Sequence, residues 1–89
     1  MAKQLHSVRT EFIDSVSDAV LSQLLDRLLQ KGMLTQEEVE IANGTRRADK
    51  ARYVVDTVIK KGSKVSLFLI ENYCKLDPHS DLCRKLTHP

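Results

Sequence analysis

Five leucines between residues 19 and 29 constrain the fold more than any other feature of the sequence. They recur at positions i, i+3, i+4, i+7 and i+8, which places them on one side of an α-helix; they are Leu21, Leu24, Leu25, Leu28 and Leu29. Ser17 and Asp18 supply oxygen acceptors for the first free amides of this helix. Gly32 can adopt the left-handed conformation that ends it. The sequence therefore predicts one well-defined helix with a leucine stripe facing a core.

Two further helices are predicted in the middle of the chain. Thr35 and Glu38 form a T-x-x-E capping box, in which each side chain can satisfy a free amide near the other. Asn43 and Gly44 interrupt the short helix that begins there. Over residues 48–61 the apolar positions follow helical rather than alternating spacing, although many are β-branched. We expect this helix to end at Gly62.

Three more helices complete the predicted fold. The apolar residues from Leu5 to Val16 indicate a first helix. Ser63 can cap a helix that is apolar on most sides, and we predict this helix to be the central, most buried one. Asp77 followed by Pro78 predicts the start of the last helix, because Pro tolerates the first helical position.

The composition is that of one small domain with an aliphatic core. The chain has 89 residues, of which 4% are aromatic, and it contains no Trp. Six short helices with brief connections predict an all-α, compact antiparallel bundle over residues 1–89. Two cysteines, Cys74 and Cys83, are too few for a disulfide framework, so we expect a reducing, cytoplasmic setting. The longest apolar stretch, residues 65–70, is far too short to cross a membrane.

Charge is distributed unevenly along the sequence. Residues 1–45 contain four basic and seven acidic residues, whereas residues 46–89 contain ten basic and five acidic ones. This asymmetry is compatible with nucleic-acid binding, with an anionic membrane surface, or with self-association in which an acidic face meets a basic one. The acidic half and the small number of aromatic residues weaken the first two interpretations.

Longer runs of residues resemble the caspase recruitment domain of the death-fold superfamily. The run LLDRLLQ at residues 24–30, followed by LTQEE at 34–38, is similar to the second and third helices of that family. The run DKAR at 49–52 is similar to its fourth helix. The run FLIENYC at 68–74, followed by Asp77 and Pro78, is similar to the fifth helix and sixth-helix entry of inflammatory caspase prodomains and their stand-alone decoys. The resemblance implies a six-helix antiparallel Greek-key bundle.

The resemblance also implies a function. Such domains do no chemistry and bind other caspase recruitment domains in a sensor, an adaptor or a pro-caspase. They form homo-oligomers or filaments in inflammasome or apoptotic signalling, with no nucleic acid and no membrane as partner. An alternative is a stand-alone decoy that caps filaments because one of its faces is incompetent, and the acid-rich first helix motivates it. A remote alternative is a helical nucleic-acid or anionic-lipid binder that uses the bases Arg46, Arg47, Lys50, Arg52, Lys60, Lys61 and Lys64.

Matching by position to the family assigns the interface residues. Its principal contact pairs acids on the second and third helices with bases on the first and fourth. The acidic candidates are Asp26, Glu37, Glu38 and Asp49, and the basic candidates are Arg52, Lys50 and Arg9. Three of them have a simpler interpretation: Asp26 and Arg52 could be solvated or could pair within the chain, and Glu38 could serve only its capping box.

Catalytic and metal sites have little support in the sequence. Cys74, His79, Cys83 and His88 could together bind zinc, but their C-x4-H-x3-C-x4-H spacing matches no zinc-finger pattern, and a buried apolar role explains Cys74. The third histidine, His6, lies near the start of the chain. No phosphate-binding loop and no nucleophile–base grouping is present, so we expect neither an enzyme nor a cofactor.

Overall fold

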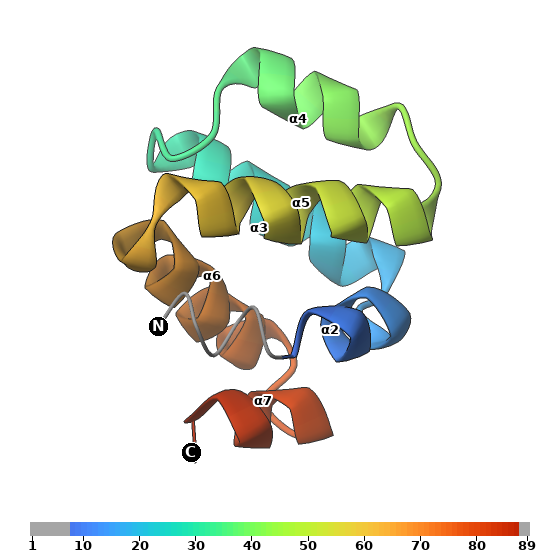
Figure 1. Cartoon of the computed structure of the whole chain (residues 1–89), viewed down its shortest axis with the longest axis vertical. Coiled ribbons are helices and arrows are strands. Elements are labelled where there is room, and N and C mark those ends of the chain that lie inside the picture. Colours follow the sequence, from blue (N-terminus) through green and yellow to red (C-terminus); the bar gives the residue numbers. More distant parts are fainter. Residues whose placement is uncertain (1–7, 88–89) are drawn as a thin grey trace.

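Six α-helices joined by short turns make up residues 8–87, the part of the chain that the computed structural model describes (Figure 1). They are α2 (Arg9–Ser15), α3 (Asp18–Gln30), α4 (Gln36–Asn43), α5 (Arg47–Lys61), α6 (Ser63–Leu76) and α7 (Asp81–Thr87). The all-α fold predicted from the sequence is confirmed. Leu5, where the first helix was expected to begin, lies outside the described residues.

Local capping signals end and begin helices as predicted. The Ser17 hydroxyl accepts a hydrogen bond from the Val20 amide at 3.1 Å, which caps α3. The Thr35 hydroxyl accepts from the Glu38 amide at 3.1 Å, and the Glu38 carboxylate accepts from the Thr35 amide at 2.9 Å. The capping box is therefore complete. Gly32 has φ 71°, the left-handed conformation expected after α3.

Two predicted capping roles are wrong. Ser63 is the first residue of α6, and its side chain caps nothing, because Gly62 at φ 104° occupies the capping position. Asp77 ends α6 instead of starting α7: its amide donates to the Tyr73 carbonyl at 2.9 Å. The last helix begins at Asp81. The hydroxyl of Ser80, the residue before it, accepts a hydrogen bond from the Cys83 amide at 3.0 Å.

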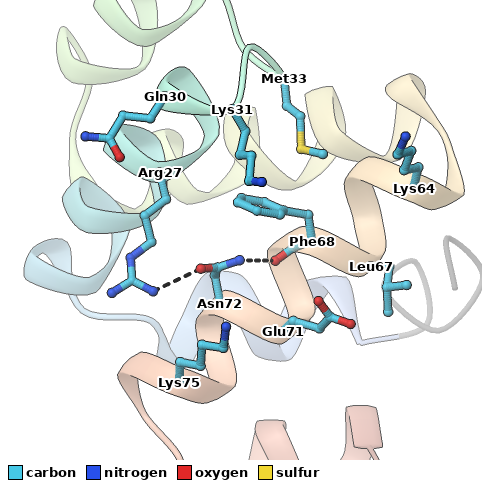
Figure 2. Close-up of a pocket in the computed structure, with 10 residues that line it drawn as sticks. All are labelled: Arg27, Gln30, Lys31, Met33, Lys64, Leu67, Phe68, Glu71, Asn72 and Lys75. Atoms are coloured by element: carbon cyan, nitrogen blue, oxygen red, sulfur yellow. Dashed lines mark hydrogen bonds between the residues drawn. The ribbon is translucent and has the colours of Figure 1, made fainter.

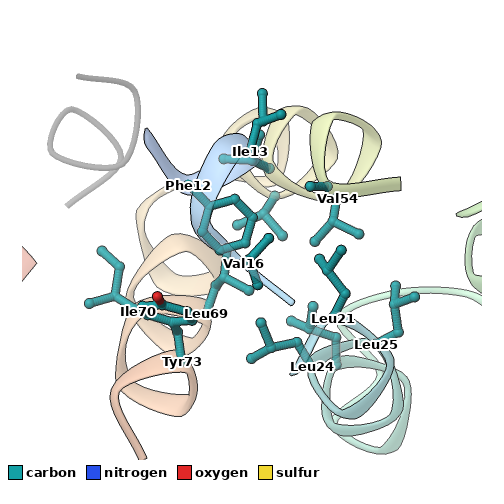
Figure 3. Packing of buried hydrophobic residues seen from close by; sticks show 14 of the residues in the cluster. Phe12, Ile13, Val16, Leu21, Leu24, Leu25, Val54, Leu69, Ile70 and Tyr73 are labelled. Atoms are coloured by element: carbon teal, nitrogen blue, oxygen red, sulfur yellow. The ribbon is translucent and has the colours of Figure 1, made fainter. Parts of the chain in front are cut away.

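The core is aliphatic and gathers around α5. Leu21, Leu24, Leu25 and Leu28 from the predicted stripe are buried. They share one cluster with Ala51, Val54, Val55 and Val58 of α5 and with other buried residues, several of which Figure 3 shows. One aromatic pair contributes, in which the Phe12 and Tyr73 rings meet edge to face at 5.8 Å. The prediction that the helix after Gly62 is the central one is wrong. α5 contacts α2, α3, α4 and α6, whereas Leu67 and Phe68 leave one side of α6 partly exposed.

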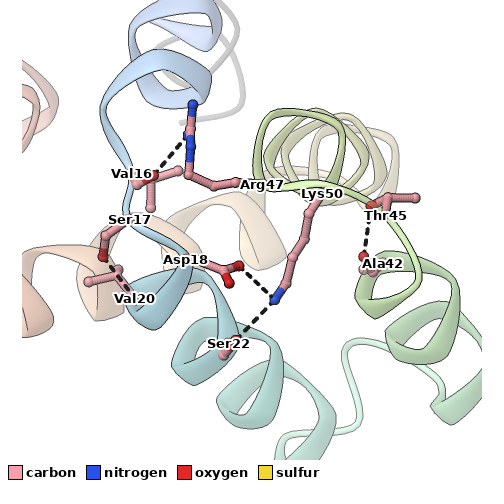
Figure 4. Close-up of polar contacts among 9 residues, drawn as sticks. All are labelled: Val16, Ser17, Asp18, Val20, Ser22, Ala42, Thr45, Arg47 and Lys50. Atoms are coloured by element: carbon pink, nitrogen blue, oxygen red, sulfur yellow. Dashed lines mark hydrogen bonds and ion pairs between the residues drawn. The ribbon is translucent and has the colours of Figure 1, made fainter.

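Lys50 is buried in this core instead of facing a partner. Its side chain is 7% exposed, and its ammonium donates to Asp18 at 3.1 Å and to Ser22 at 3.0 Å (Figure 4). Lys50 lies four and eight residues before Val54 and Val58, so helical periodicity directs it to the same buried side. The prediction that Lys50 offers an exposed base at an interface is therefore wrong.

Arg47 joins the end of α2 to the start of α5. Its guanidinium donates to the Ile13 carbonyl at 2.6 Å and to the Val16 carbonyl at 3.0 Å. These carbonyls belong to the last turn of α2 and its cap, where backbone acceptors have no partner within the helix. The neighbouring Arg46 is exposed. Two adjacent arginines thus have different roles.

A disulfide between Cys74 and Cys83 joins α6 to α7. Their Cα atoms are 5.3 Å apart, within the usual range for such a bond. The sequence predicts Cys74 as a buried apolar thiol in a reduced chain, whereas in this structure Cys74 is bonded to Cys83. The error has a physical reason: the turn at 77–80 folds α7 back onto α6, which the spacing of two cysteines alone does not reveal.

The Lys50 contact predicts an asymmetric effect on stability. Asp18→Ala should lower the free energy of unfolding by about 1–2 kcal/mol, because it leaves a buried ammonium with one hydroxyl acceptor. Lys50→Met should cost less than Asp18→Ala, because it removes the buried charge and keeps the packing. Urea denaturation measures both, with Asp14→Ala on exposed α2 surface as the control. A larger loss for Lys50→Met would contradict this account.

The two adjacent arginines give a matched pair. Arg47→Ala should lower the free energy of unfolding by about 1–3 kcal/mol, because two partly buried carbonyls lose their donor. Arg46→Ala should change it by no more than about 0.5 kcal/mol, as is usual for exposed positions. Thermal and urea unfolding of the two variants tests this difference. Equal losses would show that the carbonyl contacts of Arg47 do not hold α2 on α5.

Candidate functional site

The predicted acidic residues on α3 and α4 differ in how available they are. Asp26 and Glu37 are exposed, and within residues 8–87 neither makes a recorded ion pair or side-chain hydrogen bond. Glu38 is occupied twice, by its capping box and by Lys61 at 3.1 Å. The hydrogen bond from the Thr35 backbone, with a further contribution from Lys61, lowers the pKa of Glu38 below its usual value. Asp26 and Glu37 are therefore the acids available to a partner. We call these two residues the acidic face.

The predicted basic residues lie on α2 and α5. Arg9 donates two hydrogen bonds to Asp56, at 2.6 and 2.9 Å, which pin the start of α2 to α5. These hydrogen bonds lower the pKa of the Asp56 carboxyl, and the charges of Arg9, Lys60 and Arg52 act in the same direction. Arg9 and Arg52 thus lie within electrostatic reach of the same carboxylate. We call this α2–α5 surface the basic face.

Arg52 is exposed but has a partner on its own helix. Its guanidinium contacts Asp49, one turn earlier, at 2.6 Å, and the two side chains are 49% and 60% exposed. Asp49, predicted as an interface acid, therefore lies on the basic face beside Arg52. An exposed ion pair contributes only about 0–1 kcal/mol. Asp49 can therefore be exchanged at low cost for a carboxylate of another molecule.

Long-range ion pairs join the two halves of the sequence that carry opposite charge. Lys50 contacts Asp18, Lys61 contacts Glu38, and Lys85 contacts Glu11 at 2.6 Å. Each pair takes its acid from residues 1–45 and its base from residues 46–89. Part of the charge asymmetry is therefore satisfied inside the fold. The basic stretch considered for nucleic acid or lipid is also divided, because Arg47, Lys50, Arg52 and Lys61 are engaged within the chain.

Two long-range contacts of the candidate residues were not predicted from the sequence. Asp56 as partner of Arg9, and Asp18 as partner of Lys50, are separated from them by 47 and 32 residues. For Lys50 a signal was present, because its spacing to Val54 and Val58 places it on the core side of α5. For Asp56 the sequence offers no such signal, since its ion pair depends on how α2 docks.

No metal site was found within residues 8–87, where no group of three or more His, Cys, Asp or Glu is placed to hold an ion. Cys74 and Cys83 of the considered zinc set are joined to each other. His6 and His88 lie outside the described residues.

The described helices are all short or partly polar compared with membrane-spanning helices. None of them combines the length and the apolar character that crossing a bilayer requires.

Comparisons with known proteins agree with this geometry. The family model for the caspase recruitment domain matches residues 2–88. Caspase-1 of Sus scrofa is 42% identical over 79 residues, which are 86% of this chain and 20% of that protein. The putative caspase recruitment domain-containing protein 17P of Homo sapiens is 38% identical over 79 residues, 86% of this chain and 72% of that protein.

A solved structure confirms the predicted death-fold bundle. The solution structure of ICEBERG, described as an inhibitor of interleukin-1β generation, has a TM-score of 0.84 and 32% identity, and the match covers 96% of each chain. The chain spans about a fifth of the length of the caspase-1 relatives. The matched residues form an interaction module and not a catalytic domain. This chain belongs to the caspase recruitment domain family.

Proposed function

We propose that this domain recruits another caspase recruitment domain by placing its acidic face against the basic face of the partner. One observation carries the proposal. Asp26 and Glu37 are exposed and have no recorded partner within residues 8–87, whereas Arg9 and Arg52 are each paired with an acid of their own chain. The acidic face can bind without first breaking an internal contact. It is therefore the better docking surface of the two.

The same two faces can support chain growth. A contact between two different surfaces of identical molecules does not close at two copies, so it can continue into a filament. Arg52 can exchange Asp49 for a carboxylate of the next molecule, because exposed pairs are weak. Single contacts of this kind are weak, and multiple contacts in an assembly supply strength. Assembly should weaken as salt is added.

A second candidate function is that of a decoy, favoured by the closed state of the basic face. Arg9 is held by two hydrogen bonds to Asp56, so presenting it to a partner costs more than presenting Asp26. A domain with one open and one closed face can bind the end of a filament and stop its growth. The similarity to ICEBERG, an inhibitor of interleukin-1β generation, supports this alternative.

The two candidates differ in one measurable property. Light scattering and negative-stain microscopy of the purified domain, from high to low salt, separate them. Filaments of the domain alone support recruitment with polymerisation. A persistent monomer that shortens the filaments of a caspase-1 recruitment domain in proportion to its concentration supports the decoy.

We also propose that the domain acts in the cytoplasm, in inflammasome-type signalling, as part of or beside an inflammatory caspase. Similarity to caspase-1 supports this setting. Disulfides are rare in the reducing cytosol, so binding assays should be run with and without a thiol reductant. The proposed interface residues lie on α2 to α5, whereas the Cys74–Cys83 bond joins α6 to α7. Binding should therefore be the same under both conditions.

Charge reversal at Asp26 tests the proposed acidic face. Asp26→Arg should weaken binding to the recruitment domain of a caspase-1 relative by about 30-fold or more, since the reversal sets like charges opposite each other and costs about 2 kcal/mol or more. Arg52→Glu should have a smaller effect in the same assay, because Arg52 already has an internal partner. Fluorescence anisotropy in low salt measures both affinities.

The control is Asp81→Arg on α7. Its side chain is 86% exposed, so it carries the same charge change at a position outside both faces. It should leave the affinity within about twofold of wild type. Circular dichroism must show that all three variants are folded. If Asp26→Arg and Asp81→Arg weaken binding equally, the change in net charge alone explains the effect. That result would contradict the proposed acidic face.

A further inference from the structure

An open groove of about 830 Å³ lies between α3 and α6, outside the acidic and basic faces. Figure 2 shows Phe68 at its centre, between the side of α6 and the turn that follows α3. Leu67, Phe68 and Met33 are half-buried and form its apolar floor. α6 has more apolar residues than the core buries. Two of the half-buried ones, Leu67 and Phe68, line the groove.

The rim of the groove is strongly basic. Its charged side chains are the bases Arg27, Lys31, Lys64 and Lys75 and the acid Glu71. The three lysines are exposed, and none has a recorded ion pair within residues 8–87. Arg27 is held in place by a hydrogen bond of 2.9 Å to Asn72, whose amide donates to the Phe68 carbonyl at 2.9 Å. An occupant must therefore combine negative charge with an apolar group.

The outer side of α4 has both properties. Ile41 is 47% exposed and stands out as the exposed large hydrophobic residue of the described chain. Glu40, directly before Ile41, is exposed on the adjoining side of the helix, and the exposed Glu37 lies one turn earlier on the side of Ile41. No basic residue occurs in α4. We call Glu40 and Ile41 the α4 ridge, because Glu37 belongs to the acidic face.

We propose that the α4 ridge of one molecule docks into the α3–α6 groove of a second copy of this chain. Ile41 would pack on Phe68 and Leu67, while Glu40 meets the lysines of the rim. The contact joins two different surfaces, so a molecule that gives its ridge keeps its groove available for the next copy. The proposal rests on the proposed function, in which the domain binds domains of its own kind, and it names an additional contact.

Charge and apolar surface together favour a second copy over a small anion as the occupant of the groove. An inorganic anion would contact the rim lysines but would leave the apolar floor in water. The α4 ridge covers both parts and buries its own exposed isoleucine, which removes apolar surface from water on each partner. Arg27 and the lysines then serve specificity and association rate more than affinity.

Photo-crosslinking of the whole chain tests this contact. The photoreactive residue p-benzoylphenylalanine is placed at position 41, and this protein is mixed with ¹⁵N-labelled wild type, so that mass spectrometry separates contacts between copies from contacts within one. Crosslinks to labelled residues 27–33 or 64–75 are expected. Lys64→Glu in the labelled copy should lower their yield about tenfold by setting like charges opposite each other. Arg84→Glu, an exposed reversal on α7, should leave it unchanged.

A charge swap adds a gain of function that misfolding cannot imitate. Lys64→Glu alone and Glu40→Lys alone should each crosslink poorly, because like charges meet in the contact. A mixture of the two should regain a yield close to that of wild type, since each mixed contact then pairs opposite charges. Crosslinks that map elsewhere, or a Lys64→Glu yield equal to wild type, would overturn the proposal. So would NMR shifts of groove amides on adding inorganic phosphate without any shift on raising protein concentration.

The test separates this contact from the proposed function. Asp26→Arg should weaken binding to another recruitment domain and leave the crosslink from position 41 in place. Lys64→Glu should lower the yield of that crosslink about tenfold and leave Asp26-dependent binding in place. Absence of the crosslink with the wild-type groove, while Asp26→Arg still weakens binding, overturns the groove contact alone. An intact crosslink with no effect of Asp26→Arg overturns the acidic face alone.

Discussion

The burial of α5 among four other helices decides where the charges of this domain can act. A core built almost entirely from Leu, Val, Ile and Ala has no polar partner to offer, so each charged residue on α5 is sorted by its angle on the helix. Lys50 points inward and needs Asp18 and Ser22, whereas Arg47 points sideways and binds the end of α2. Arg52 points outward and is available to another molecule. Three bases within six residues thus have three roles.

Internal ion pairs determine which face is ready to bind. The acids Glu11, Asp18 and Glu38 of the first half are matched by lysines of the second half, and Arg9 is matched by Asp56. Asp26, Glu37 and Glu40 stay outside these pairs, as do the lysines of the groove rim. A partner therefore meets these unpaired charges, and the charge asymmetry along the sequence does not describe the surface it contacts. The basic face is partly neutralised, which makes recruitment through the acidic face the easier step.

The sequence predicts what depends on neighbouring residues and misses what depends on docking. The caps at Ser17 and Thr35 and the turn at Gly32 were predictable, because each is decided within four residues. The start of α7 was not, because Asp77 was already used to end α6. The Arg9–Asp56 pair needs the docked position of α2, and no local pattern records it. Periodicity places Lys50 on the core side of α5, whereas position in the family pattern points to an interface. Apart from Lys50, the interface positions themselves stay predictions.

The most direct measurement of the central claim is NMR shift mapping of the ¹⁵N-labelled domain, in low salt, on adding an unlabelled caspase-1 recruitment domain. The account predicts that the largest shifts occur at amides near Asp26 and Glu37 on α3 and α4, and that they fade as salt is added. Shifts confined to the surroundings of Arg9 and Arg52 would contradict it, because the internally paired face would then be the one that binds first.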